Sequence, residues 1–208
     1  MFTITRSLTA AVAFAVVSAA VPALAGPPLI CHPFETRGGT LLPWDASSAS
    51  TNWRSPLSSY NTAGLAADVV KLLNTDAPVL TRMENLRRAT IYAHKDPVLA
   101  RQLLEAVLSR KGGPQEWFDA GYLLETYKQA VPIRDKKDEP AWAAVDEAIK
   151  ADGYGFVKKA MTMIGVPNAE MEFAASLMTR GAVSAEHRAR ASAAAPKSSA
   201  LADNLARY

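Results

Sequence analysis

The sequence predicts an all-α protein, built as an array of antiparallel helix hairpins with an extended N-terminal strap. Three observations predict this fold. Apolar residues recur every three or four positions in one segment after another from about residue 61 onward. No stretch shows the sustained apolar–polar alternation of a half-buried strand. The linkers between helical segments are short, apart from 131–139, and short linkers make consecutive helices antiparallel neighbours.

Residues 1–25 are expected to be a secretory signal peptide and not part of the fold. Arg6 precedes an uncharged run of small and apolar residues, and Ala-Leu-Ala at 23–25 is typical of a cleavage site. The run is too short and alanine-rich for a stable span, which needs about 20 strongly apolar residues. An uncleaved membrane anchor is the alternative. We therefore expect a mature chain that starts at Gly26 and is periplasmic or extracellular, with no stable membrane insertion.

Residues 26–60 are expected to form the strap. This segment is rich in Pro, Gly and Ser and has no helical period, yet it carries more large apolar residues than a disordered tail would. We expect it to lie on the surface of a helical domain that spans 61–208. Its expected apolar anchors are Leu29, Ile30, Phe34, Leu41, Leu42, Trp44 and Trp53.

The first three helices are expected over 62–73, 77–95 and 96–111. The first places Leu65, Val69, Leu72 and Leu73 on one face, and the second repeats the pattern with Val79, Met83, Leu86 and Thr90. Asp76 is the candidate N-cap of the second helix. Asp96 is the N-cap candidate of the third, with Pro97 at the first helical position and two glycines, 112–113, at its end.

The remaining helices follow the same logic. Pro114 opens a helix over 114–130, and a charged loop with Pro132 separates it from a helix over 140–153 that Gly153 is expected to end. Further helical segments are expected at 154–164, 168–181, 184–194 and 198–208.

Residues 78–130 resemble tetratricopeptide-like repeats. In "WFDAGYLL" at 117–124, Trp117 stands for the Trp of the repeat's first helix, Gly121 for its close-contact glycine and Leu124 for its Tyr. Ala89 and Tyr92 occupy the same offset 32 residues upstream, against a repeat period of 34, and the segment 131–139 breaks the register. The second-helix face is matched by Ala100, Leu104 and Val107. The resemblance implies that Gly121 lies at a helix crossing and that the array offers a concave surface to a partner.

The single cysteine, Cys31, stands beside His32 in "PPLICHPF" at 27–34. The start of the mature chain resembles that of uncharacterised secreted bacterial proteins, which carry no activity to transfer. Covalent c-type haem needs C-x-x-C-H, and Pro28 stands where the first Cys is required. Pro33 keeps His32 extended, so the side chains of Cys31 and His32 point to opposite faces. We expect Cys31 to be structural, and Cys31→Ser to cost less stability than Phe34→Ala.

Other titratable residues suggest no site by their spacing. Glu84 can pair with Arg87 and Arg88 at i+3 and i+4, which is worth a few tenths of a kcal/mol on an exposed helix. His187 lies beside Arg188 and is expected at the surface. Glu170 and Glu172 are two apart on a helix and face different directions, which argues against a carboxylate pair.

The function predicted on this basis is protein–protein interaction or scaffolding outside the cytoplasm. No hydrolase, zinc, Walker or dinucleotide motif is present, so no catalytic residue, metal ligand or cofactor is assigned. The 23 basic and 20 acidic residues are interspersed, which argues against a nucleic-acid partner. The candidate binding residues are Cys31, His32, Tyr92 and Trp117. A metal, haem or thiol site at Cys31 and His32 is the alternative function.

Overall fold

The computed structural model describes residues 28–45, 56–74, 76–110, 112–135 and 139–208. Within them the chain is all-α and forms no strand, which confirms the predicted fold class. The expected signal peptide and the strap anchor Trp53 lie outside these residues. Across the same ranges, no helix is both long enough and apolar enough to cross a membrane.

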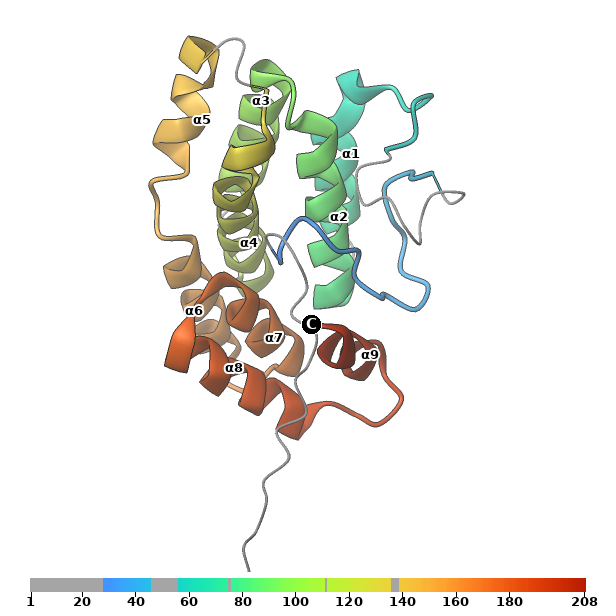
Figure 1. The fold of residues 1–208 in the computed structure, drawn as a ribbon, viewed down its shortest axis with the longest axis vertical. Coiled ribbons are helices and arrows are strands. Elements are labelled where there is room, and N and C mark those ends of the chain that lie inside the picture. The colour runs from blue at the N-terminus through green and yellow to red at the C-terminus, as the bar shows by residue number, and fades with distance from the viewer. Residues whose placement is uncertain (1–27, 46–55, 75, 111, 136–138) are drawn as a thin grey trace, which may run out of the picture.

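The helices follow one another with short connections (Figure 1). In the view of Figure 1, α1 to α5 form the upper part of the body and α6 to α9 the lower part. Their bounds are α1 Leu65–Leu73, α2 Val79–Ala93, α3 Pro97–Leu108, α4 Pro114–Ala130, α5 Ala143–Ala148, α6 Gly153–Ile164, α7 Ala169–Met178, α8 Gly181–Ala194 and α9 Ala200–Arg207.

Side-chain caps decide where several helices begin. Asp96 caps α3 as expected, because its carboxylate accepts hydrogen bonds from the N–H groups of Val98 and Leu99. Asp152, Asn168 and Ser199 cap α6, α7 and α9 in the same way.

Two expected helix ends are wrong. The N-cap position of α2 is Pro78 and not Asp76. The N–H of Leu80 in the first turn of α2 instead donates to Glu170 Oε2 of α7, at 3.1 Å. Gly153 was expected to end a helix, but it starts α6. The partner at the start of α2 comes from a distant part of the chain, whereas α6 starts at Gly153 because the neighbouring Asp152 caps it locally.

The core is centred on α4, which packs against α2, α3, α6 and α7. Its most extensive contact is with α6, and the two helices approach closely at Gly121 and Gly153. A Cβ atom added at Gly121 would lie only 2.4 Å from the carbonyl oxygen of Gly153. The prediction that Gly121 sits at a helix crossing is therefore confirmed.

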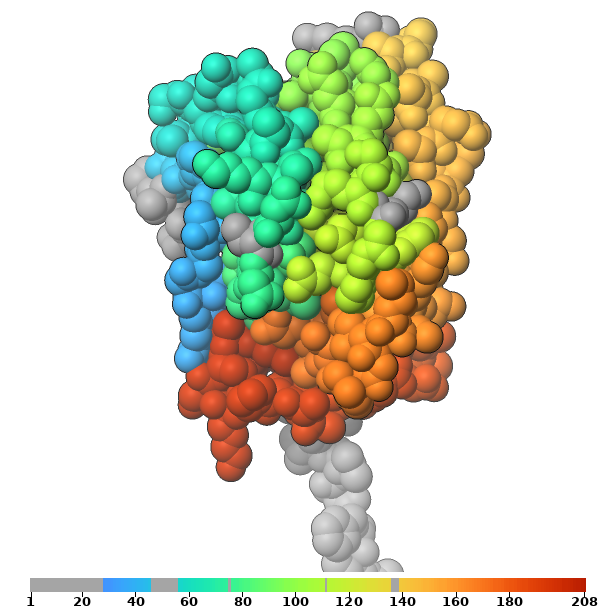
Figure 2. Space-filling view, turned by 180° about the vertical axis from the view of Figure 1, so that it is seen from behind, coloured from blue at the N-terminus to red at the C-terminus, as the bar shows by residue number. Residues whose placement is uncertain are grey.

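The second helix is buried on nearly all sides because strap residues 28–45 cover its polar face. Leu29, Ile30, Phe34 and Leu42 are at most 5% exposed, as the docked strap requires. Figure 2 shows these strap residues (blue) running along the body toward the C-terminal helices (red). The expected surface pairs of Glu84 are therefore corrected: its carboxylate and the Arg87 side chain are both fully buried.

A second buried charge cluster joins α1, α2 and α4. Arg82 donates to Asp119 Oδ2 at 2.6 Å, and Arg110 donates to the same oxygen at 3.2 Å. Arg82 also donates to the carbonyl oxygen of Leu73 at the end of α1. Burial raises the pKa of the Asp119 carboxyl to about 6, against the opposing attraction of the two guanidinium groups.

Candidate functional site

Tyr92 holds two parts of the strap together. Its hydroxyl donates to the carbonyl oxygen of Pro43 at 2.6 Å and accepts from the N–H of Leu57 at 3.0 Å. Its ring packs on those of Trp44 and Tyr60, with centroids 5.8 and 4.8 Å away. These contacts give Tyr92 an internal role in the fold.

Trp117 lies at the α4–α6 contact. Its ring meets Phe156 edge to face at 4.8 Å, and the Lys159 ammonium lies 3.5 Å from its centroid. Both neighbours are on α6, and neither belongs to the surroundings of Tyr92, Cys31 or His32. The structure does not bring the four candidate residues into one site.

Cys31 is 6% exposed and belongs to a small apolar cluster between the strap and the helices α2 and α4. The buried members of this cluster are Ile30, Cys31, Ile91 and Ala130. His32 is turned to the C-terminus, where its ring meets Tyr208 edge to face at 5.7 Å and its carbonyl oxygen accepts from the Tyr208 hydroxyl at 2.7 Å. Within the described ranges, no three His, Cys, Asp or Glu side chains are arranged to hold a metal ion.

The burial of Cys31 predicts slow reaction of the native thiol. A thiol reagent at neutral pH is expected to label Cys31 far more slowly in the folded protein than in urea, because the strap must lift before the sulfur meets solvent. Absorbance of the released chromophore measures both rates. Equal rates in the two conditions would show that the strap does not protect the thiol.

The structure assembles a group of side chains that spacing alone did not indicate. Tyr154 of α6, Glu172 of α7 and His187 and Arg190 of α8 form one hydrogen-bonded chain. The Tyr154 hydroxyl lies 2.7 Å from His187 Nε2, and His187 Nδ1 lies 2.5 Å from Glu172 Oε2. His187 is 5% exposed, so the expectation that it lies at the surface is wrong.

Nδ1 of His187 lies beside both charged members of this group. It is 2.5 Å from Glu172 Oε2, which accepts, and 2.7 Å from Arg190 Nη2, which donates. The Nε of Arg190 donates to the same Glu172 oxygen at 2.9 Å. The other ring nitrogen of His187, Nε2, faces the Tyr154 hydroxyl. Burial raises the pKa of that hydroxyl, so Tyr154 keeps its proton at neutral pH.

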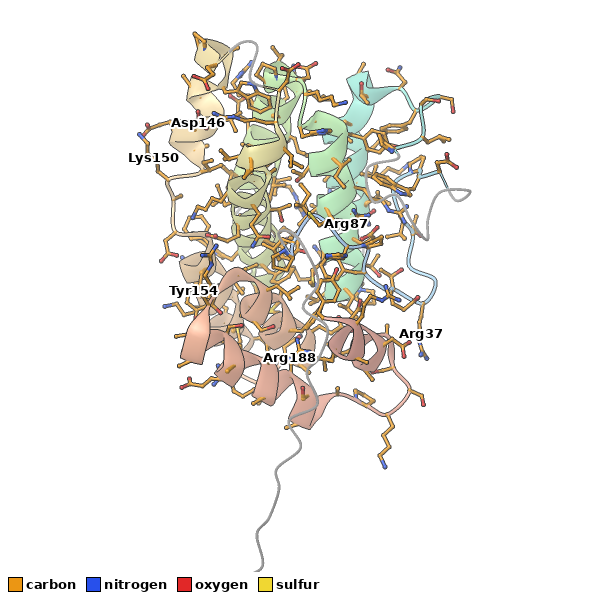
Figure 3. All side chains as sticks on the ribbon, in the orientation of Figure 1. Arg37, Arg87, Asp146, Lys150, Tyr154 and Arg188 are labelled. Carbon is orange, nitrogen blue, oxygen red and sulfur yellow. The ribbon has the colours of Figure 1, made fainter. Side chains whose placement is uncertain are left out.

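This arrangement orients the His187 ring, because both of its nitrogens have polar neighbours. Tyr154 lies at the α6 side of the body in Figure 3, with the Lys158 ammonium 4.7 Å from its ring centroid. Sequence reasoning had one available signal, the i, i+3 spacing of His187 and Arg190. It had none for Glu172 and Tyr154, which are 15 and 33 residues from His187.

An open groove begins at the other side of Glu172 and Arg190. We call it the apolar groove; it has a volume of ≈ 580 Å³ and lies between the α6–α7 turn and the C-terminal end of α8. Its apolar wall is formed by Met161, Gly165, Val166, Ala169, Ala193 and Ala194. Val166 in this turn is 64% exposed. An exposed apolar side chain beside an open, mainly apolar groove is typical of a contact surface.

No family model, no curated protein and no solved structure matches the chain.

Proposed function

We propose that this chain is an exported interaction module that binds an apolar segment of a partner protein in the apolar groove. The observation that carries the proposal is the exposed apolar side chain of Val166 at a groove with a mainly apolar wall. Burying each large apolar side chain against a partner contributes about 1.5–3 kcal/mol. Met161 also lines the groove, and a methionine side chain adapts its shape to different partners.

The polar end of the groove limits which segments fit. Glu172 and Arg190 stand there as a hydrogen-bonded pair, so their charges are already mutually neutralised. A partner segment that is apolar and uncharged therefore meets no unpaired charge at this end. The export of the chain and its tetratricopeptide-like character over 78–130 stay predictions from the sequence, and the groove does not depend on the latter.

The proposal predicts that Val166→Glu weakens binding of the partner. A photo-crosslinking residue at position 166 is expected to capture a specific partner in an envelope extract, and the purified partner is then titrated against the variants. Val166→Glu should weaken binding more than about tenfold, since a charge replaces a buried contact. Val166→Glu and the photo-crosslinking variant should both keep the wild-type melting temperature, because Val166 is 64% exposed and contributes little to the fold.

Val98 offers a matched control. It is 55% exposed on α3 and does not line the apolar groove. Val98→Glu should leave partner affinity within about twofold, and a photo-crosslinker at 98 should not capture the same partner. Equal capture at both positions, or an unchanged affinity of Val166→Glu, would refute the proposed function.

A further inference from the structure

The backbone of strap residues 28–45 obtains its hydrogen bonds from side chains of the helical body. These residues form no helix or strand, so their N–H and C=O groups need other partners. Gln129 accepts from Leu29, and Glu84 accepts from Phe34, at 2.8 and 3.0 Å. Further side-chain bonds to strap backbone come from Asn85, Arg87, Arg88, Tyr92, Asn204, Arg207 and Tyr208.

Two asparagines bond the strap through both ends of their amides. Asn85 accepts from the N–H of Leu42 at 2.8 Å and donates to the carbonyl oxygen of Thr40 at 3.0 Å. Asn204 makes the same double contact with the N–H and C=O of Glu35, at 3.0 and 2.9 Å. These contacts address main-chain groups, as a neighbouring strand would. They hold an extended peptide whatever side chains it carries at those positions.

The apolar anchors supply the remaining specificity. Leu29, Phe34 and Leu42 join the main core of the body, and Phe34 stacks on Tyr208 with centroids 5.4 Å apart. Figure 3 places Arg87, which donates to the carbonyl oxygen of Ile30, at the centre of the body. We call the surface of the body that contacts residues 28–45 the strap groove. Without the strap, this groove would expose its apolar side chains to water, together with hydrogen-bond donors and acceptors that are already positioned for a peptide backbone. An extended peptide with the same apolar anchors is therefore the ligand that fits it best.

The contacts of residues 28–45 described above are non-covalent, and they are made to side chains that every copy of the chain carries. Pro43 and Leu57 both bond to the hydroxyl of Tyr92. The strap of a second copy has the same residues, so the same contacts are open to it. We propose that the strap groove also accepts the strap of a second copy, so that two chains exchange straps. The ratio of exchanged dimer to monomer depends on the chain concentration relative to the effective concentration of the chain's own strap, which is in the millimolar range for a short link.

The first experiment cuts the link in the full chain. Residues 48–53 are replaced by a protease recognition sequence, and the folded protein is cleaved so that both pieces remain. A fluorescent peptide of residues 26–45 is expected to exchange into the cleaved protein, as measured by anisotropy. Asn204→Leu should weaken this binding about tenfold or more, since two bonds to the strap are lost. Asp203→Asn on the same helix removes only an exposed ion pair with the strap residue Arg37, so it should change the binding less than about threefold.

The second experiment tests exchange between intact chains. Two copies with different tags are co-refolded at low and at high concentration and analysed by native mass spectrometry. We expect mixed dimers that increase with concentration and that dissociate into monomers when the link is cleaved. If the peptide binds but only monomers form at every concentration, exchange between copies is refuted. If cleavage unfolds the protein, or the peptide does not bind, the strap groove does not accept a separate strap peptide. Val166→Glu should leave both results unchanged, which separates them from the proposed function.

Discussion

Replacing Glu84 by glutamine is expected to destabilise the protein by about 3–5 kcal/mol, because it leaves buried guanidinium groups without their counter-charge. The carboxylate accepts four hydrogen bonds, from Arg87 Nε and Nη2, from Arg88 Nε and from the N–H of Phe34. An amide NH2 group at one of these positions would face donors only. Chemical denaturation followed by circular dichroism measures the loss.

Glu105 provides the matched control for this change. It forms an i, i+4 ion pair with Arg101 in which both side chains are largely exposed. Glu105→Gln should change the free energy of unfolding by less than about 0.5 kcal/mol, because an exposed pair is screened by solvent. Equal effects of the two substitutions would show that the Glu84 cluster is not buried in solution.

The loss of unfolding free energy caused by Glu84→Gln should also depend on pH. Burial alone would raise the pKa of the Glu84 carboxyl, but the attraction and hydrogen bonds of Arg87 and Arg88 lower it below its ordinary value of 4.5. A lowered folded-state pKa contributes stability above the unfolded pKa, and this stability is lost as the pH falls through the folded value. The difference between wild type and Glu84→Gln should therefore shrink below about pH 4.5.

Asp119 changes the stability with pH in the opposite direction to Glu84. The free energies of unfolding of wild type and Glu84→Gln must therefore be subtracted at each pH. With its pKa raised to about 6, the native state binds a proton that the unfolded chain still lacks between pH 6 and the ordinary aspartate value of 3.8. Asp119 therefore adds stability as the pH falls through this window. Its contribution is common to wild type and Glu84→Gln and cancels when the two curves are subtracted.

Gly121→Leu is expected to cost about 3 kcal/mol, at the upper end of the range for overpacking. The obstructing atoms are the carbonyl oxygen of Gly153 and the Cβ atom of Phe156, 2.4 and 2.9 Å from a Cβ built at Gly121. Neither is the end of a flexible side chain, so the two helices must separate. The midpoint of thermal unfolding should fall by several degrees.

Gly64 is a suitable control for Gly121. A Cβ at Gly64 would meet only Asp68 Oδ2, at an ordinary 3.6 Å, and the residue has a negative φ of −90°. Gly64→Ala should therefore be neutral or stabilising by less than about 1 kcal/mol. An unchanged melting temperature for Gly121→Leu would mean that Gly121 is not at the α4–α6 contact in solution.

Local signals in the sequence predicted the helices well where the deciding partners are close in the chain. Asp96 with Pro97 marked the start of α3, because a cap bonds to N–H groups two and three residues ahead. The periodic apolar residues identified most of the core, and the strap anchors Leu29, Ile30, Phe34 and Leu42 are buried as expected. The resemblance of 117–124 to the first helix of a tetratricopeptide-like repeat predicted a crossing at Gly121, and Gly121 lies at the α4–α6 contact.

The sequence by itself determined the all-α class and the docked anchors of the strap, because period and capping act within a few residues. Only the tertiary structure decided which charges are buried. Glu84 and its arginines have the spacing of a surface pair, and the strap, some 50 residues earlier, removes them from water. His187 likewise meets Glu172 and Tyr154 only because α6, α7 and α8 fold together. Burial and hydrogen bonding between distant segments depend on packing, which no local pattern of residues encodes.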